Sequence, residues 1–167
     1  IGLENRWYFK NGRLNPIRKI KKIKQEKDIL LLSLFNVGTN PERILINDII
    51  GDNSQVVIPD RKNKLDYLSY IQRSKFNLCP EGNGPDTHRV WESLMLKSIP
   101  IMIKNNFSKQ LTDYNIPILL IDDWDKLREV DKDKFNTFYE NNSQKLETFN
   151  YVHFSYWENK FNQYLDV

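Results

Sequence analysis

Residues 74–103 read SKFNLCPEGNGPDTHRVWESLMLKSIPIMI, and the pattern of the whole chain can be followed outward from this segment. The apolar runs at 75–79 (KFNLC) and 99–103 (IPIMI) have the length of strands that are buried on both faces. Between them, Pro and Gly at 80–85 interrupt regular structure, and 86–97 carries apolar residues at helical spacing. A buried strand, a helix and a second buried strand form the repeating unit of a parallel sheet.

The same alternation continues on both sides of this segment. Further strands are predicted at 28–35, 55–58 and 117–121, further helices at 40–51 and 65–71, and helical structure from 123 onward with a break near 150. We therefore predict an α/β fold: a Rossmann-like open parallel sheet of about five strands, with helices on both faces and a helical C-terminus. Ligands of such sheets bind at the carboxyl ends of the strands, so the loop after 75–79 is in the right place for a site.

The composition is that of an ordinary globular protein. The 167 residues are 40% hydrophobic and 28% charged, which suffices for one core and argues against disorder. No apolar run approaches the roughly 18 residues that a membrane-spanning helix needs. Cys79, the one cysteine, lies in an apolar run and is interpreted as a buried, inert thiol. Because the chain lacks an initiator Met, we expect an excised domain of a longer protein, cytoplasmic or, with an anchor elsewhere, in a Golgi-type lumen.

Positive charge is concentrated at the N-terminus. The net charge is +3, but residues 1–27 hold nine Lys or Arg against two Glu, a balance of +7. We divide the chain into a basic N-terminal arm, 1–27, and a Rossmann-like domain with C-terminal helices, 28–167. A solvated arm is favoured, and an arm that holds nucleic acid or an anionic surface is the alternative. Three aromatic residues precede the basic run instead of alternating with it, so no nucleic-acid partner is expected.

The loop and helix start at 80–89 carry the candidate chemistry. The prolines and glycines of the loop permit close approach of the backbone to a ligand. Asp86 is expected to cap the helix, so that Thr87, His88 and Arg89 form its first turn. The N–H groups of a first turn have no partner within the helix and the helix dipole is positive there, which favours binding of a diphosphate. Thr87 adds a hydroxyl donor, and Arg89 adds a charged fork of donors.

The predicted helix has two faces. Its apolar residues fall together and are expected to pack on the sheet: Val90, Trp91, Leu94 and Met95. His88, Arg89 and Glu92 share the opposite side, and Glu92 lies one turn deeper, where a carboxylate accepts hydrogen bonds from both hydroxyls of a ribose. The alternatives are that Asp86 is only a cap, that Arg89 and Glu92 are a surface ion pair, and that His88 is solvated.

On these residues, 74–103 resembles the signature of exostosin-like glycosyltransferases. In that family, a strand ending in Cys-Pro is followed by a Gly-containing loop, a Thr/Ser-His/Ala-Arg helix start, a small-residue turn and Ile-Pro-Val/Ile. The likeness extends over roughly 28–130 and includes PILLIDDW at 117–124. Such enzymes have two Rossmann-like halves in the GT-B arrangement, and the C-terminal half binds the nucleotide sugar.

The resemblance implies transfer of a sugar from a UDP- or GDP-sugar to a glycan or protein acceptor, with no metal and no other cofactor. Arg89 and the helix dipole would stabilise the departing diphosphate, and His88 and Glu92 are the other candidate catalytic residues. The implied donor-binding residues are Asn36, Thr39, Arg43, Glu81, Asn83, Gly84, Asp86, Thr87, His88, Arg89 and Glu92. Positions 57–61 are expected to border the base, and the alternative for Arg43 is the surface of its helix.

Two departures from the family bear on this assignment. Several members have a basic residue where this chain has Glu81, whose charge would weaken diphosphate binding unless it points away or meets a sugar hydroxyl. About 27 residues precede the first strand, too few for a second Rossmann half, so the base for the acceptor is expected on a further domain or chain. The alternatives are a non-catalytic module that binds a nucleotide sugar or a partner, and an unrelated Rossmann-like nucleic-acid binder. We expect Arg89→Ala and Glu92→Ala each to abolish a nucleotide-induced rise in Tm without changing the Tm of the unliganded protein.

Three other patterns are assigned structural roles. Asp123-Trp-Asp125 has the Asp-x-Asp form that binds manganese in the other large glycosyltransferase fold, but it opens a predicted helix and is interpreted as a cap with a first-turn acid. His88 and Glu92 have the helical spacing of metal ligands but lack an apparent third ligand, so no metal site is predicted. The C-terminal aromatic residues are interpreted as helix-packing residues and not as a sugar platform: Phe135, Phe138, Tyr139, Tyr151, Phe154, Tyr156, Trp157, Phe161 and Tyr164.

Overall fold

The computed structural model describes residues 15–60, 63–151 and 153–165. Its elements in chain order are α2 (Asn15–Lys22), β1 (Ile29–Leu32), η1 (Val37–Thr39), α3 (Glu42–Ile50), β2 (Val56–Val57), α4 (Lys64–Arg73), β3 (Ser74–Leu78), α5 (His88–Met95), β4 (Ile99–Ile103), α6 (Asn106–Asp113), β5 (Leu119–Ile121), η2 (Trp124–Leu127), α7 (Lys132–Glu147) and α8 (Phe154–Leu165). Each predicted strand and helix has a counterpart here, and α2, η1 and α6 are additional.

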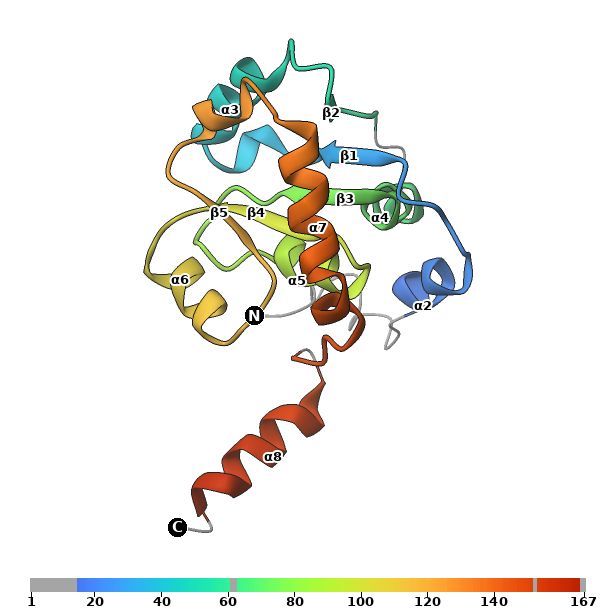
Figure 1. Cartoon of the computed structure of the whole chain (residues 1–167), viewed down its shortest axis with the longest axis vertical. Coiled ribbons are helices and arrows are strands. Elements are labelled where there is room, and N and C mark those ends of the chain that lie inside the picture. The colour runs from blue at the N-terminus through green and yellow to red at the C-terminus, as the bar shows by residue number, and fades with distance from the viewer. Residues whose placement is uncertain (1–14, 61–62, 152, 166–167) are drawn as a thin grey trace.

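The five strands form one sheet in the order β2-β1-β3-β4-β5, and every neighbouring pair is parallel (Figure 1). The predicted Rossmann-like open sheet is therefore confirmed. β1 leads to β2 on one side of the sheet, whereas β3 leads to β4 on the other side. The connections thus diverge between β1 and β3, and in open α/β sheets this point is where a crevice forms at the carboxyl ends of the strands.

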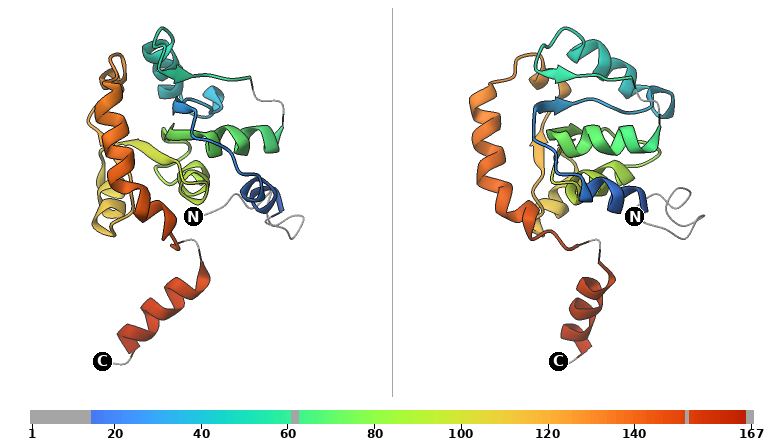
Figure 2. Two further views of the ribbon diagram at one scale, coloured as in Figure 1. Left: turned by 45° about the vertical axis from the view of Figure 1, so that its right-hand side comes forward. Right: turned by 90° about the vertical axis from the view of Figure 1, so that its right-hand side faces the viewer.

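Helices cover both faces of the sheet because the strands are apolar on both sides. α7 lies over one face, while α4 and α5 lie over the other (Figure 2). The ring of Phe76 in β3 packs against three aromatic residues of α7, at centroid distances of 5.1 Å to Phe135, 6.2 Å to Phe138 and 6.0 Å to Tyr139. The packing role predicted for these three residues is confirmed.

The last helix differs from this pattern. α8 extends away from the sheet and its covering helices (Figures 1 and 2), and Trp157 and Phe161 are exposed on it. Tyr156 contacts Tyr151 and Trp157, with ring centroids 4.6 Å and 5.2 Å away. The side chains of Phe154 and Tyr164 lie outside the described part of the chain. None of the described helices is long and apolar enough to cross a membrane.

The C-terminal part of the basic arm is packed onto the domain. Ile17 and Ile20 of α2 are buried in an apolar cluster with Leu68 and Ile71 of α4, so α2 turns its lysines outward. This packing explains why the segment folds as a helix in spite of its charge, since tertiary burial of one apolar face stabilises a short helix. Residues 1–14 of the arm lie outside the described residues, and the domain division at residue 27 stays a prediction.

Lys27, which follows α2, has an unusual environment. Its Nζ donates to the carbonyl oxygen of Ser74 at 2.8 Å and to that of Leu96 at 3.1 Å. Burial, and then the charge of Lys97, lower the pKa of Lys27 from 10.5 to about 7. Between pH about 7 and pH 10.5, the amine of Lys27 is protonated in the unfolded chain but largely neutral in the folded chain, so the free energy of unfolding rises with pH. This contribution to stability is complete above the unfolded pKa and is lost as the pH falls toward the folded pKa.

We therefore expect Lys27→Met to flatten the pH dependence of stability. The free energy of unfolding of the wild type should rise relative to that of the variant between pH about 7 and pH about 9.5, because only the wild type carries this titrating amine. Urea denaturation at both pH values measures the difference. Lys24→Met, at an exposed position, is the control and should track the wild type. A difference between wild type and Lys27→Met that does not change with pH would contradict the assigned shift.

Candidate functional site

A cavity of about 420 Å³ opens at the carboxyl end of the sheet, beside the loop between β3 and α5. Its walls come from the start of α4, the β3–α5 loop, the first turns of α5 and one side chain of α3. It is lined by Arg43, Lys64, Tyr67, Gly82, Asn83, Gly84, Asp86, Thr87, His88, Arg89 and Glu92. Eight of the eleven predicted donor-binding residues are thus brought together here, and Asn36, Thr39 and Glu81 are not among them. The three lining residues that were not among the predicted site residues are Lys64, Tyr67 and Gly82.

The start of α5 has no side-chain cap. Thr87 is the N-cap, with extended backbone angles of φ −109° and ψ 145°, and its side chain makes no capping hydrogen bond. The hydroxyl oxygen of Thr87 is buried and has no hydrogen-bond partner among the described residues. The N–H of Val90 donates to the carbonyl oxygen of Thr87 at 3.1 Å, and no side chain caps the start of α5, so the positive end of the helix dipole is open to an anion.

The prediction that Asp86 caps this helix is wrong. Its Oδ1 accepts a hydrogen bond of 2.7 Å from Nε1 of Trp91. Trp91 is buried, and a buried indole N–H needs an acceptor, so the carboxylate is drawn to the side of the helix and away from the N-cap position. The helix begins at His88, one residue later than the predicted first turn, and Thr87 takes the N-cap position.

Two arginines lie against one aromatic ring. The guanidinium carbons of Arg43 and Arg89 are 5.7 Å and 5.6 Å from the ring centroid of Phe35. Burial, and then the charge of Arg89, lower the pKa of Arg43. Nε of Arg89 is buried and has no hydrogen-bond partner in the described structure. The site therefore holds two like charges close together, one of which carries an unused donor.

Arg43 connects the loops on either side of the crevice. It is only 4% exposed, and it donates to the carbonyl oxygens of Asn36 at 2.8 Å, Glu81 at 2.8 Å and Pro80 at 3.3 Å. Its guanidinium is thus engaged with backbone from both loops. Arg43 was expected to contact the diphosphate or, as the alternative, to lie on the surface of its helix. Neither expectation includes the observed contacts, in which three carbonyl oxygens hold the side chain between the loops and keep it from the helix surface.

The three remaining predicted residues have other partners. Oδ1 of Asn36 accepts from the N–H of Gly38 at 2.9 Å and holds the turn after β1. A Cβ on Gly82 would lie 3.9 Å from Cγ2 of Thr39, so the methyl group of Thr39 lies next to this loop. The carboxylate of Glu81 accepts from Nδ2 of Asn105 at 2.8 Å, at the start of α6. Glu81 therefore does not line the cavity, and its carboxylate is engaged by an amide donor outside it.

Glu92 is buried, which corrects its predicted place on an open polar side of the helix. It is 2% exposed, and its oxygens accept from Nζ of Lys64 at 2.5 Å and from the hydroxyl of Tyr67 at 2.7 Å. The physical reason is that α4 packs over this side of α5. Burial, and then the charge of Glu92, raise the pKa of Tyr67 well above its usual value, so the phenol stays a donor.

The Asp-x-Asp segment is structural, as predicted. Oδ1 of Asp123 accepts from the N–H of Asp125 at 2.8 Å and caps η2, and Asp125 forms an ion pair of 2.6 Å with Arg128. Within residues 15–60, 63–151 and 153–165, no group of three or more His, Cys, Asp or Glu side chains has an arrangement suited to a metal ion. Cys79 is buried as predicted, and burial raises the pKa of its thiol to about 12, which disfavours the thiolate.

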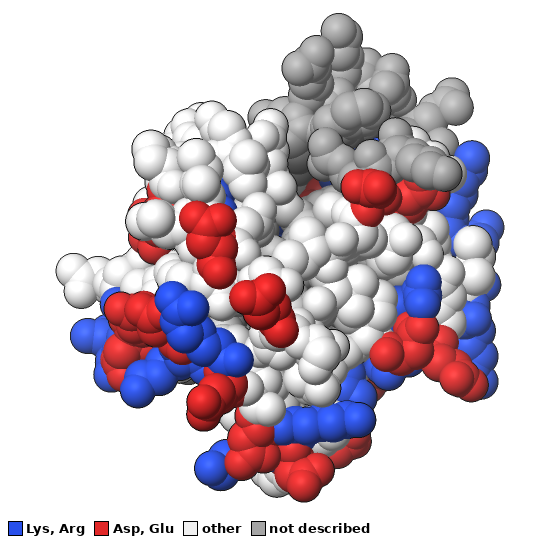
Figure 3. All heavy atoms as spheres, turned by 90° about the horizontal axis from the view of Figure 1, so that it is seen from above, with Lys and Arg blue, Asp and Glu red and all other residues white. Residues whose placement is uncertain are grey.

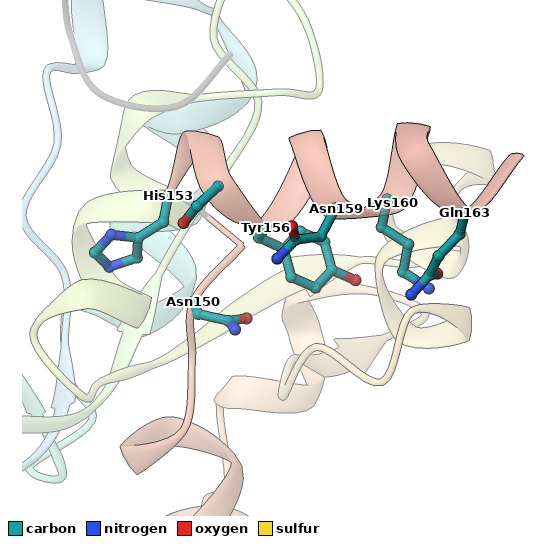
Figure 4. Close-up of a pocket in the computed structure, with 7 residues that line it drawn as sticks. Asn150, His153, Tyr156, Asn159, Lys160 and Gln163 are labelled. Atoms are coloured by element: carbon teal, nitrogen blue, oxygen red, sulfur yellow. The ribbon is translucent and has the colours of Figure 1, made fainter. Parts of the chain in front are cut away.

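Two further cavities bear on the assignment. The cavity along α8, of about 490 Å³, is lined by side chains of α8 and the loop before it (Figure 4), far from the strand ends that position the predicted residues. Another, of about 320 Å³, lies beyond β1 and β2 and includes Phe35, Pro59 and Asp60. Positions 57–61 were expected to border a base, and two of them line this second cavity, while Arg61 lies outside the described residues.

Comparison with protein-family models finds no match to this chain, and comparison with curated proteins finds none. The functional argument therefore depends on the fold and on the cavity itself.

The glycines of the loop form a matched pair for testing the role of Arg43. A Cβ added to Gly82 would lie 3.2 Å from Nη2 of Arg43 and 3.5 Å from Cγ2 of Thr87, whereas one added to Gly84 meets no described atom within 4 Å. Both changes to Ala restrict the unfolded chain, which stabilises a tolerant site by about 0.4–1 kcal/mol. We expect Gly84→Ala to melt at or above the wild-type Tm, and Gly82→Ala to melt below Gly84→Ala. Equal Tm values for the two unliganded variants would argue against a close fit around Arg43.

Proposed function

We propose that the 420 Å³ cavity binds the diphosphate of a UDP- or GDP-sugar and that this chain is the donor-binding part of a glycosyltransferase. The observation that carries the proposal is a pair of buried, unpartnered donors, the hydroxyl of Thr87 and Nε of Arg89, beside the uncapped start of α5. Buried donors without partners are rare in native structures and call for an explanation such as a ligand or water. A diphosphate would accept from both donors and would lie at the positive end of the α5 dipole.

The residues around the proposed diphosphate site are compatible with the nucleoside part of a nucleotide sugar. Phe35 lines the smaller cavity and also contacts Arg89 of the larger one, so a nucleoside could extend from the diphosphate toward Pro59 and Asp60. Glu92 lines the larger cavity but already accepts from Lys64 and Tyr67. A ribose hydroxyl must join or displace one of these donors, which makes the ribose contact a further part of the proposal.

In the proposed reaction, the bond between the anomeric carbon and the diphosphate oxygen breaks, and the diphosphate leaves with the electron pair. Arg89 and the start of α5 stabilise the negative charge that grows on the leaving oxygen. A bond forms between the anomeric carbon and the acceptor hydroxyl, whose proton goes to a base. His88 lies exposed at the cavity and is the candidate that this chain offers for proton transfer; the alternative is a base from an acceptor-binding domain.

A non-catalytic donor-binding module is the second candidate, and one observation favours it. The two carboxylates that line the cavity are both engaged by the protein, Asp86 with Trp91 and Glu92 with Lys64 and Tyr67. A general base must be within hydrogen-bond reach of the proton that it removes. Neither carboxylate among the described lining residues can serve as the base without giving up a contact with the protein, which favours a module that binds without catalysis.

A panel of UDP, GDP, their common sugar conjugates and ADP distinguishes these possibilities. Thermal unfolding should show a rise in Tm with UDP or GDP conjugates, and product analysis should show slow release of nucleoside diphosphate if the domain is an enzyme. A rise in Tm without turnover supports the binding module. The donor-site proposal is rejected if no nucleotide changes the Tm at millimolar concentration while single-stranded nucleic acid binds with a steep salt dependence.

A further inference from the structure

A further cavity, of about 280 Å³, lies at the opposite end of the sheet from the proposed donor site, where β1 and β3 begin. Five lysines line it: Lys21, Lys22, Lys24, Lys27 and Lys97. They come from the end of α2, the segment that joins it to β1, and the turn after α5. No acidic side chain is among the described lining residues. In Figure 3, Lys and Arg side chains run along the right-hand edge of the molecule, the side on which Figure 1 places α2 and α4.

Most of this positive charge is not neutralised by the protein. Within the described residues, Lys97 forms an ion pair with Glu147, but Lys21, Lys22, Lys24 and Lys27 have no acidic partner within 4.0 Å. Like charges that converge in a partly buried space repel each other, and an anion in that space removes the repulsion. Burial, and after it the charge of Lys97, lower the pKa of Lys27, so the protonated amine would gain from an anion beside it.

The fold itself accounts for two of these lysines, Lys97 through its ion pair with Glu147 and Lys27 through backbone contacts. Lys27 donates to the carbonyl oxygens of Ser74 and Leu96, and so it satisfies backbone at the ends of two elements. Lys21, Lys22 and Lys24 are exposed at the rim and make no such contact among the described residues. Oε1 of Gln72, which also lines the cavity, is buried without a partner there, although its Nε2 donates to the carbonyl of Ile23. The cavity therefore offers several positive donors and one unused acceptor.

We propose that this lysine cavity is a separate binding site for a small soluble anion that carries two or more phosphate groups. Ammonium groups on flexible stems act as point charges and suit phosphate oxygens in many orientations. The volume admits a small molecule and is below that of a pocket for a drug-sized ligand, which begins at about 300 Å³. No aromatic side chain is among the described lining residues, so the stacking surface that single-stranded nucleic acid uses is missing.

Tripolyphosphate is the probe, titrated by calorimetry into the whole chain at constant ionic strength. All proteins carry Arg89→Ala, so that the proposed donor site does not dominate the signal. In this background Lys22→Gln/Lys24→Gln should weaken tripolyphosphate binding at least about tenfold, since it removes two charges from the rim. The matched control is Lys109→Gln/Lys126→Gln, which removes the same charge from exposed positions elsewhere and should change binding less than about twofold.

Three results would overturn the proposal: the absence of saturable binding, equal weakening by the control pair, and tighter binding of a single-stranded oligonucleotide than of tripolyphosphate through the same lysines. Equal weakening would mean that the net charge of the chain, and not this cavity, attracts the anion. The two sites are tested independently. A nucleotide effect that survives Lys22→Gln/Lys24→Gln but is lost in Arg89→Ala belongs to the donor site, whatever the outcome at the lysine cavity.

Discussion

Arg89→Ala should weaken the binding of UDP or GDP by about 100-fold, and so remove the rise in Tm that the nucleotide produces. The guanidinium of Arg89 lines the cavity, and its Nε has no described partner, so it is poised to donate to a diphosphate oxygen. A hydrogen bond to a charged group contributes about 1.5–3 kcal/mol, and the upper part of that range corresponds to the expected loss of affinity. Calorimetric titration gives Kd directly, and thermal unfolding gives the Tm.

The unliganded Arg89→Ala protein should melt close to the wild type, because the side chain gives up mainly its contact with Phe35. Arg128→Ala is the control: Arg128 is exposed and pairs only with Asp125 among the described residues, so the variant loses the same charge far from the cavity. If Arg89→Ala and Arg128→Ala bind the nucleotide with equal affinity, the diphosphate is not held at the start of α5. A lower Tm without ligand would instead indicate that Arg89 has a structural role.

Glu92→Ala should lower the free energy of unfolding by about 3 kcal/mol, even without a ligand. This replaces the expectation from sequence that the unliganded Tm would not change. Glu92 is 2% exposed, and removing it takes away the carboxylate to which both Lys64 and Tyr67 donate. Removing one partner of a buried ion pair is strongly destabilising, because the remaining charge stays in a place that disfavours it. Urea denaturation at neutral pH measures the loss.

Glu92→Gln separates charge from shape at the same position. Its amide oxygen still accepts from Tyr67, so we expect it to lose less stability than Glu92→Ala, while any ribose contact that requires the carboxylate is weakened. Glu129→Ala, at an exposed position, is the surface control and should unfold like the wild type. A Glu92→Ala protein as stable as the wild type would show that the ion pair with Lys64 adds nothing to folding. Its nucleotide affinity would then test the ribose contact directly.

The order of strands and helices could be predicted because it depends on local patterns. Buried parallel strands are continuous apolar runs, and β3 and β4 occur where such runs were identified, with the loop of Pro and Gly between β3 and α5. The short α6 was overlooked although its start has a local signal, since Asn105 and Ser108 form a reciprocal capping box. The same local signals brought Gly84, Thr87 and Arg89 to one cavity wall, because these residues are neighbours in the chain.

The partners of the charged side chains could not be predicted, because they come from distant parts of the chain. Lys64 and Glu92 are 28 residues apart, and Arg43 and the carbonyl of Glu81 are 38 apart. Whether a carboxylate faces a ligand, a lysine or solvent depends on which helix packs over it, and hydrophobic periodicity carries no information about that neighbour. The sequence alone thus determined the parallel sheet, its loops and the residues at the start of α5. Only the tertiary structure decided that Arg43 joins two loops, that Glu81 turns to Asn105 and that Glu92 is buried beneath α4, because such long-range pairing follows from packing and not from local pattern.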